Sequence, residues 1–292
     1  MTALLIPLGL VVLMVAVGLE TRLDDFRALA RTPAAVVLGL LVQGLALPLL
    51  AAGLATLFAL PPIHAVGLVL LAAVPGGVTA NFVTLMGRGD VALSVTLTVA
   101  TSLAAPLAVP LWVAAAFEHF ADQTVAVTLP LGPTVGAIAL TTVAPLLLAV
   151  ALGHARPALA ARLRAPMRRV STAVFLAIVT AAILAQWSAL GDAWAAVGPA
   201  ALAWHLAGLG LGVALAALVG LARARPVAGV MTTGLRNVAV ALTVAISLLG
   251  RPELAVAATV YVVVMNVVAL AVVAVVRRLS EVKDAAAPGD IV

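Results

Sequence analysis

The feature that most constrains the fold of this chain is a series of nine long, continuously apolar runs. Hydrophobic residues make up 65% of the 292-residue sequence and charged residues only 9%, whereas roughly half of a soluble domain is apolar. Each run has about the 20 residues that a helix needs to cross a bilayer, and the runs lack the alternation of β-barrel strands. We therefore predict an all-α integral membrane protein whose nine transmembrane helices cover residues 4–19, 34–58, 65–86, 91–117, 131–152, 170–187, 197–221, 227–249 and 254–276.

The basic residues indicate how these helices are oriented. If the N-terminus lies outside, all but two of the 16 Lys and Arg residues fall in cytoplasmic segments; the exceptions are Arg251, outside, and Arg236, within the eighth run. Positively charged loops are retained on the cytoplasmic side of membranes. We therefore predict a multi-pass protein of the inner cell membrane with its C-terminus in the cytoplasm, and we attribute the net charge of +5 to topology rather than to a nucleic-acid partner.

Two of the apolar runs are interrupted by helix-breaking residues. The third contains VPGGVTAN at residues 74–81 and the eighth contains MTTGLRN at residues 231–237. Proline and glycine unwind helices, and unwound backbone inside a membrane is tolerated only where it is buried in protein or lines a cavity. A single break is also explained by close helix packing, but a pair in corresponding halves is the best sequence indicator of a binding site in inverted-repeat transporters.

The nine-helix count places the third and eighth runs in opposite directions, as inverted halves require. We expect one membrane transporter domain over residues 1–292, with a first repeat over about 1–117, a second over about 131–278 and a short cytoplasmic tail over 279–292. The chain has no cysteine, and its acidic residues fall at helix ends, in loops or in the tail. We therefore expect neither an enzyme nor a bound cofactor.

Arg236 is the one cation that the sequence places inside the membrane. A central arginine costs about 2.5–3.5 kcal/mol on insertion scales, so it should have a specific partner. The planar guanidinium suits carboxylates, sulfates and phosphates, which favours contact with an anionic substrate together with Asn237, Thr79 and Asn266. The alternative is that Arg236 caps free carbonyl groups of the broken helix or extends along its stem toward the membrane surface. His205, inside the seventh run, is the one candidate for a buried titrating group.

Four short strings make the chain similar to the bile acid:sodium symporter family, including its bacterial members, from about residue 18 to residue 276. They are GLE to DF at 18–26, PGG to AN at 75–81, DVALS to T at 90–98 and GLRN at 234–237. The resemblance implies a core domain and a panel domain, with two broken helices crossing behind the substrate cavity. It also implies that the first of ten helices is absent here.

The resemblance further implies two sodium sites. The first would use Ala80, Asn81, Ser94, Thr98 and Thr232, and the second Gln43, Thr232, Thr233, Leu235 and Arg236. This chain departs from the family pattern at three positions, because Thr232 replaces the usual Glu, Arg236 the usual Gln and Ala80 the usual Ser. A guanidinium about one turn from a bound Na⁺ would oppose it by several kcal/mol.

These changes suggest that the guanidinium of Arg236 stands where a second cation would sit. We therefore expect secondary active transport of a small organic anion, bile-acid-like or another carboxylate, that is independent of sodium or works by exchange. Two alternatives stay open. One is a sodium-coupled symporter that keeps one sodium site, and the other is a membrane receptor that binds the anion without moving it.

Overall fold

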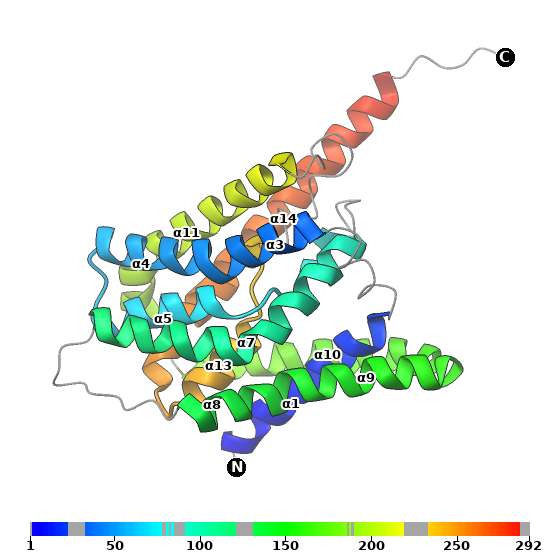
Figure 1. The fold of residues 1–292 in the computed structure, drawn as a ribbon. Helices are drawn as coiled ribbons and strands as arrows, with labels where there is room; N and C mark the ends of the chain where they lie inside the picture. Colours follow the sequence, from blue (N-terminus) through cyan, green and yellow to red (C-terminus); the bar gives the residue numbers. More distant parts are fainter. Residues whose placement is uncertain are drawn as a thin grey trace.

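The computed structural model describes residues 2–22, 33–77, 80–81, 83–84, 91–120, 131–185, 187, 190–218 and 233–286. Regular structure in these residues is helical apart from one isolated β-bridge. Figure 1 shows helices packed lengthwise against one another, with the C-terminal part of α14 extending beyond the rest. The elements are α1 (Thr2–Glu20), α3 (Pro33–Leu41), η1 (Val42–Ala46), α4 (Leu47–Leu57), α5 (Pro62–Ala73), α7 (Val91–Phe120), α8 (Leu131–Ile138), η3 (Ala139–Val143), α9 (Ala144–Ala155), α10 (Pro157–Ala185), α11 (Leu190–Leu218), α13 (Val238–Leu242), η6 (Thr243–Leu248), η7 (Pro252–Leu254) and α14 (Ala255–Ala286).

The predicted all-helical membrane fold is confirmed. In the described part of the chain six helices are long and apolar enough to cross a membrane, over residues 36–57, 93–120, 132–155, 157–185, 191–215 and 252–272. The first, third and eighth predicted runs overlap, in whole or in part, with the shorter apolar helices Ile6–Glu20, Pro62–Ala73 and Val238–Leu248. The count of nine crossings therefore remains a prediction.

Outside the interrupted runs, the two largest differences between helix boundaries and predicted spans are in α10 and α14. Helix α10 begins at Pro157, well before the predicted residue 170, and α14 continues to Ala286, into the predicted tail. Hydropathy marks where a chain enters lipid, whereas a helix can continue into water when its side chains are good helix formers. Alanine, leucine and arginine dominate residues 158–169, so the helix extends beyond its apolar part.

Two of the spans contain a π-helical segment shortly before a proline. The segment η1 precedes Pro48 and η3 precedes Pro145. Proline has no N–H, so the carbonyl four residues earlier loses its helical partner. In the first span this carbonyl belongs to Gly44, and it accepts a hydrogen bond from Trp112 Nε1 on α7 at 2.7 Å instead. This first span, residues 36–57 with the π-helical bulge η1, is called the bulged span below. It presents backbone oxygens that side chains from other helices can bind.

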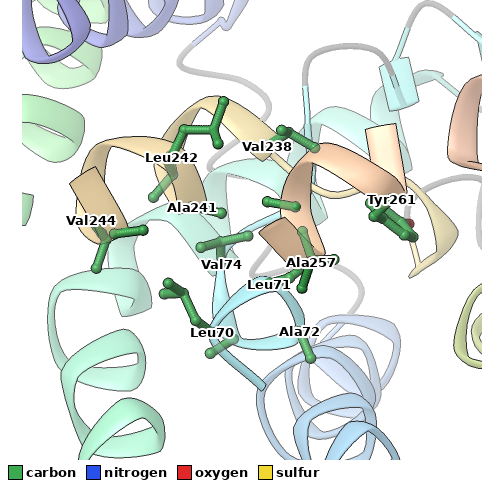
Figure 2. Packing of buried hydrophobic residues seen from close by; sticks show 14 of the residues in the cluster. Leu70, Leu71, Ala72, Val74, Val238, Ala241, Leu242, Val244, Ala257 and Tyr261 are labelled. Atoms are coloured by element: carbon green, nitrogen blue, oxygen red, sulfur yellow. The ribbon is translucent and has the colours of Figure 1, made fainter. Parts of the chain in front are cut away.

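The two interrupted segments lie at the centre of the hydrophobic core. Every residue from Ala65 to Ala73 of α5 is buried, as is every residue of α13. A helix that is apolar on all sides belongs inside the protein rather than at its surface. Figure 2 shows Leu70 and Val74 at the end of α5 beside Ala241 of α13 and Val244 of η6, which follow the second break. The breaks are therefore surrounded by other helices.

Close packing of α5 on the start of α14 depends on Gly67. A Cβ atom added there would lie 2.6 Å from the carbonyl oxygen of Leu254 and 3.3 Å from the Cβ of Ala257. Because the first neighbour is backbone, we expect Gly67→Ala to lower the free energy of unfolding by about 1–3 kcal/mol. Gly53→Ala on α4 is the control, since nothing lies within 4 Å of its added Cβ. Thermal melting in detergent compares the two, and a Gly67→Ala protein as stable as the control would contradict this packing.

Candidate functional site

The two interrupted segments pair with each other through their backbones. Gly76 and Arg236 form an antiparallel bridge. Two hydrogen bonds of 2.9 Å flank it, from Gly77 N to the Leu235 oxygen and from Asn237 N to the Pro75 oxygen. Pro75 cannot donate a hydrogen bond, but its carbonyl is used here, so the break satisfies backbone groups that unwinding would otherwise leave unpaired.

The guanidinium of Arg236 lies among three oxygen atoms. Its Nη1 donates to Gln43 Oε1 at 3.0 Å, and its Nη2 donates to the Gln43 carbonyl at 3.1 Å and to the Ala72 carbonyl. Only 1% of Arg236 and 2% of Gln43 is exposed. These contacts join residues 193 positions apart in the sequence, and they join both interrupted segments to the bulged span.

Both carbonyls are free for reasons that the sequence supplies. In η1 the N–H of Leu47 bonds to the Val42 oxygen, which takes it away from Gln43. The next donor that could reach the Gln43 carbonyl in a π-helix would be residue 48, which is a proline without an N–H. The Ala72 carbonyl would pair with the amide of Gly76 in a continuous helix, but the chain is extended from Val74 onward. Arg236 therefore caps carbonyls that two helix irregularities release.

The charge of Arg236 is not cancelled by any described side chain. The three hydrogen bonds of its guanidinium to Gln43 and Ala72 end on neutral oxygens, and its Nε has no hydrogen-bond partner among the described residues. The ring of Trp204 lies 6.0 Å from the guanidinium carbon, at the outer limit of a cation–π contact. Capping of carbonyls, one of the two interpretations of Arg236, is thus present in this structure, and contact with an anion remains a prediction.

A second group of polar side chains gathers around Asn81. Ser94 Oγ donates to Asn81 Oδ1 at 2.6 Å, and Thr98 Oγ1 lies 3.4 Å from the same oxygen. Thr84 Oγ1 lies 3.5 Å from Ser94 Oγ. Ser94, Thr98 and Thr84 are buried. Three residues that the resemblance assigned to the first sodium site are therefore neighbours, and neutral oxygens of this kind are ligands for hard cations.

The remaining predicted site residues are placed differently. Asn237 is buried and caps α13, with its Oδ1 accepting from Val240 N at 3.3 Å. Asn266 is exposed, and its Nδ2 donates to the Val262 carbonyl of its own helix at 2.6 Å. Thr233 is buried. Thr79 and Thr232 lie outside the described residues.

Three aromatic residues complete the site without having been predicted. Trp204 Nε1 donates to the Leu47 carbonyl at 2.9 Å, and Trp112 caps Gly44 of the same bulged span. Tyr261, the one tyrosine of the chain, donates its hydroxyl hydrogen to the Gly234 carbonyl in the second break. A buried indole N–H or phenol needs an acceptor. Tryptophan and tyrosine residues inside the apolar runs were therefore the sequence feature that could have indicated these contacts.

His205 is positioned by this same tyrosine. Its Nδ1 lies 3.0 Å from the Tyr261 hydroxyl. His205 is 1% exposed, and its Nε2 has no partner among the described residues. The imidazole thus supports the broken segment through Tyr261.

Comparison with known proteins finds transporters among the sequence relatives of this chain. The uncharacterized sodium-dependent transporter YocS of Bacillus subtilis is 40% identical over 93 residues, which are 32% of this chain and 29% of YocS. The probable chloroplastic sodium/metabolite cotransporter BASS1 of Arabidopsis thaliana is 41% identical over 90 residues, 31% of this chain and 22% of BASS1. Human P3 protein is 36% identical over 81 residues, 28% of this chain and 17% of P3. The chain thus spans less than a third of each of these relatives.

The match to the family covers a longer stretch of this chain than the alignment with any of these relatives. Residues 7–192 match the pattern that defines the sodium bile acid symporter family, which is more than half of the chain. This stretch includes the first break, Gln43 and the cluster around Asn81. The family is one of transporters, which confirms the prediction that the chain is not an enzyme. This chain therefore belongs to the sodium bile acid symporter family.

Proposed function

We propose that this protein is a secondary active carrier that moves a small organic anion, a carboxylate, across the membrane by alternating access. The observation that carries this proposal is the buried guanidinium of Arg236, whose described partners are all neutral. A carboxylate 5 Å away would be attracted by about 3 kcal/mol at an effective dielectric constant of 20. The adjoining breaks supply unwound backbone of the kind that lines carrier binding sites.

One sodium ion is proposed to accompany the anion. Asn81, Ser94 and Thr98 supply the oxygens of this site, and the similarity to the sodium-dependent transporter YocS and the sodium/metabolite cotransporter BASS1 favours sodium over a sodium-independent mechanism. The guanidinium of Arg236 takes the place of a second ion, since it already occupies the oxygens of Gln43 and Ala72. Sodium-independent exchange is the competing mechanism, favoured by the loss of the usual Glu and Ser at Thr232 and Ala80.

Substrate contacts are proposed for Arg236, Asn237, Thr79 and Asn266. Arg236 retains one donor, Nε, without a partner in the described part of the chain, and this N–H can bind a carboxylate oxygen. Asn266 is exposed and needs only to release the carbonyl of its own helix to offer its amide. The side chain of Asn237, whose Oδ1 caps α13, is a further proposed contact.

The proposed carrier forms one membrane domain with nine crossings, built from inverted halves over about 1–117 and 131–278. We assign the third and eighth crossings to short apolar helices together with the adjoining breaks. The distribution of arginines supports an inner-membrane location with the N-terminal end of the first helix outside and the C-terminal tail in the cytoplasm.

Uptake into liposomes tests the proposed function. Purified protein is first screened against organic acids by thermal shift, and the best ligand is then used in radiolabelled form. With an inward gradient we expect uptake in sodium buffer to exceed uptake in choline buffer at least fivefold. Equal uptake in the two buffers would contradict sodium coupling and favour exchange, and binding without any flux would favour the anion receptor.

A further inference from the structure

The first half of α10 carries a dense group of arginines outside the proposed transport site. Arg156 precedes the helix, and Arg162, Arg164, Arg168 and Arg169 follow within it. All five are exposed. No acidic residue lies between positions 154 and 170. This segment therefore carries a strong local positive charge.

The length of α10 places these arginines at the edge of the bilayer. The helix has 29 residues and is about 43 Å long at 1.5 Å per residue, against a hydrocarbon core of about 30 Å. Residues 170–185, which follow the last arginine, carry no charged side chain and rise about 24 Å. When this part crosses the lipid, the arginines lie at the depth of the phospholipid headgroups.

Two of the arginines are held by the neighbouring helix α1, which packs along α10 (Figure 1). Arg164 Nε donates to the Leu19 carbonyl at 2.8 Å, and Arg168 Nη1 lies 4.0 Å from Glu20. They flank the packed face of α10, where Ala160 is fully buried. These two arginines therefore contact the end of α1.

Arg162 and Arg169 point the other way. They are seven residues apart and so share one face of the helix, about 150° around the axis from the packed face. Neither has an ion-pair or hydrogen-bond partner among the described residues. Helix α10 is the least buried of the six long apolar helices: 11% of its most apolar 18-residue stretch is buried, against 33–61% in the others. Its outward face is therefore the one that meets lipid.

We propose that Arg162 and Arg169 bind the phosphate groups of anionic phospholipids, so that this outward face of α10 is an anionic-lipid site. A guanidinium binds phosphate through two parallel hydrogen bonds. Basic groups next to a membrane span attract anionic headgroups with about 1 kcal/mol per arginine. The site is separate from the break region and makes no use of the transported solute.

Native mass spectrometry of the detergent-purified protein with short-chain phosphatidylglycerol tests this proposal. We expect Arg162→Gln with Arg169→Gln to raise the dissociation constant about 5- to 30-fold, from about 1 kcal/mol for each arginine, while binding of phosphatidylcholine is unchanged. Arg164→Gln with Arg168→Gln is the matched control, with the same loss of charge on the other face, and should change it less than threefold. If loosening of α1 destabilises that control, Arg168→Gln alone replaces it.

An unchanged dissociation constant in the outward pair, or an equal loss in both pairs, would overturn the proposal. In the first case the face would be free to hold an acidic protein segment, and in the second the helix would attract lipid by diffuse charge alone. A melting temperature within a few degrees of the wild type verifies that the exposed outward pair leaves the fold intact.

Discussion

Arg236→Leu is expected to abolish uptake and to lower the free energy of unfolding by about 3–9 kcal/mol, because three buried oxygens lose their donor and each costs about 1–3 kcal/mol unpaired. Those oxygens belong to Gln43 and Ala72, in the bulged span and at the first break. Leucine fills much of the same volume but donates no hydrogen bond. Uptake into liposomes and melting in detergent measure the two effects.

Two further variants separate the charge of Arg236 from its geometry. Arg236→Lys keeps the charge but not the planar fork, so it should fold better than Arg236→Leu and retain weak uptake. Arg251→Leu, in the half-buried turn before α14, removes an arginine outside the site and should leave uptake unchanged. An Arg236→Leu protein with normal uptake and normal stability would show that the guanidinium is not needed.

Ser94→Ala is expected to raise the sodium concentration for half-maximal uptake about 10- to 100-fold, since an oxygen that contacts a charged group contributes about 1.5–3 kcal/mol. Ser94 Oγ lies 2.6 Å from Asn81 Oδ1, at the centre of the polar cluster. The maximal rate at saturating sodium should change less, because Ser94 lies in the cluster around Asn81, whereas the anion is proposed to bind at Arg236. A sodium titration of uptake makes the measurement.

Thr101→Val provides a matched control for the serine. Thr101 is also a buried hydroxyl residue of α7, but its Oγ1 donates to the carbonyls of Leu97 and Thr98 in its own helix. Its loss should shift the sodium requirement less than twofold. If both variants shift it equally, the effect comes from α7 as a whole and the cluster around Asn81 is not the ion site.

The sequence was sufficient for the helical class and for the positions of the breaks. Bilayer thickness fixes the length of an apolar run, and proline and glycine have local effects that need no knowledge of distant residues. Pro75 and Gly76 therefore revealed the first break directly. The spans 36–57 and 132–155 agree with the predicted runs within a few residues for the same reason.

The partners of Arg236 could not be found in this way. The sequence was compatible with two kinds of partner for Arg236, an anion or unpaired backbone carbonyls. Deciding between them requires knowing which carbonyls are unpaired. That depends on the π-helical segment before Pro48 and on a contact between residues 193 positions apart. Trp204 was missed because an apolar run hides an indole whose N–H finds a carbonyl on another helix. Local patterns fix neither the bulge nor the long-range contact.

Sodium binding to the purified protein, measured with radiolabelled Na⁺ at equilibrium, tests the central claim most directly, since it does not depend on knowing the substrate. With the guanidinium of Arg236 occupying the oxygens of Gln43 and Ala72, one ion should bind per chain, and Ser94→Ala should weaken that binding at least tenfold. Two ions per chain, or one ion whose binding is unaffected by Ser94→Ala, would contradict the account.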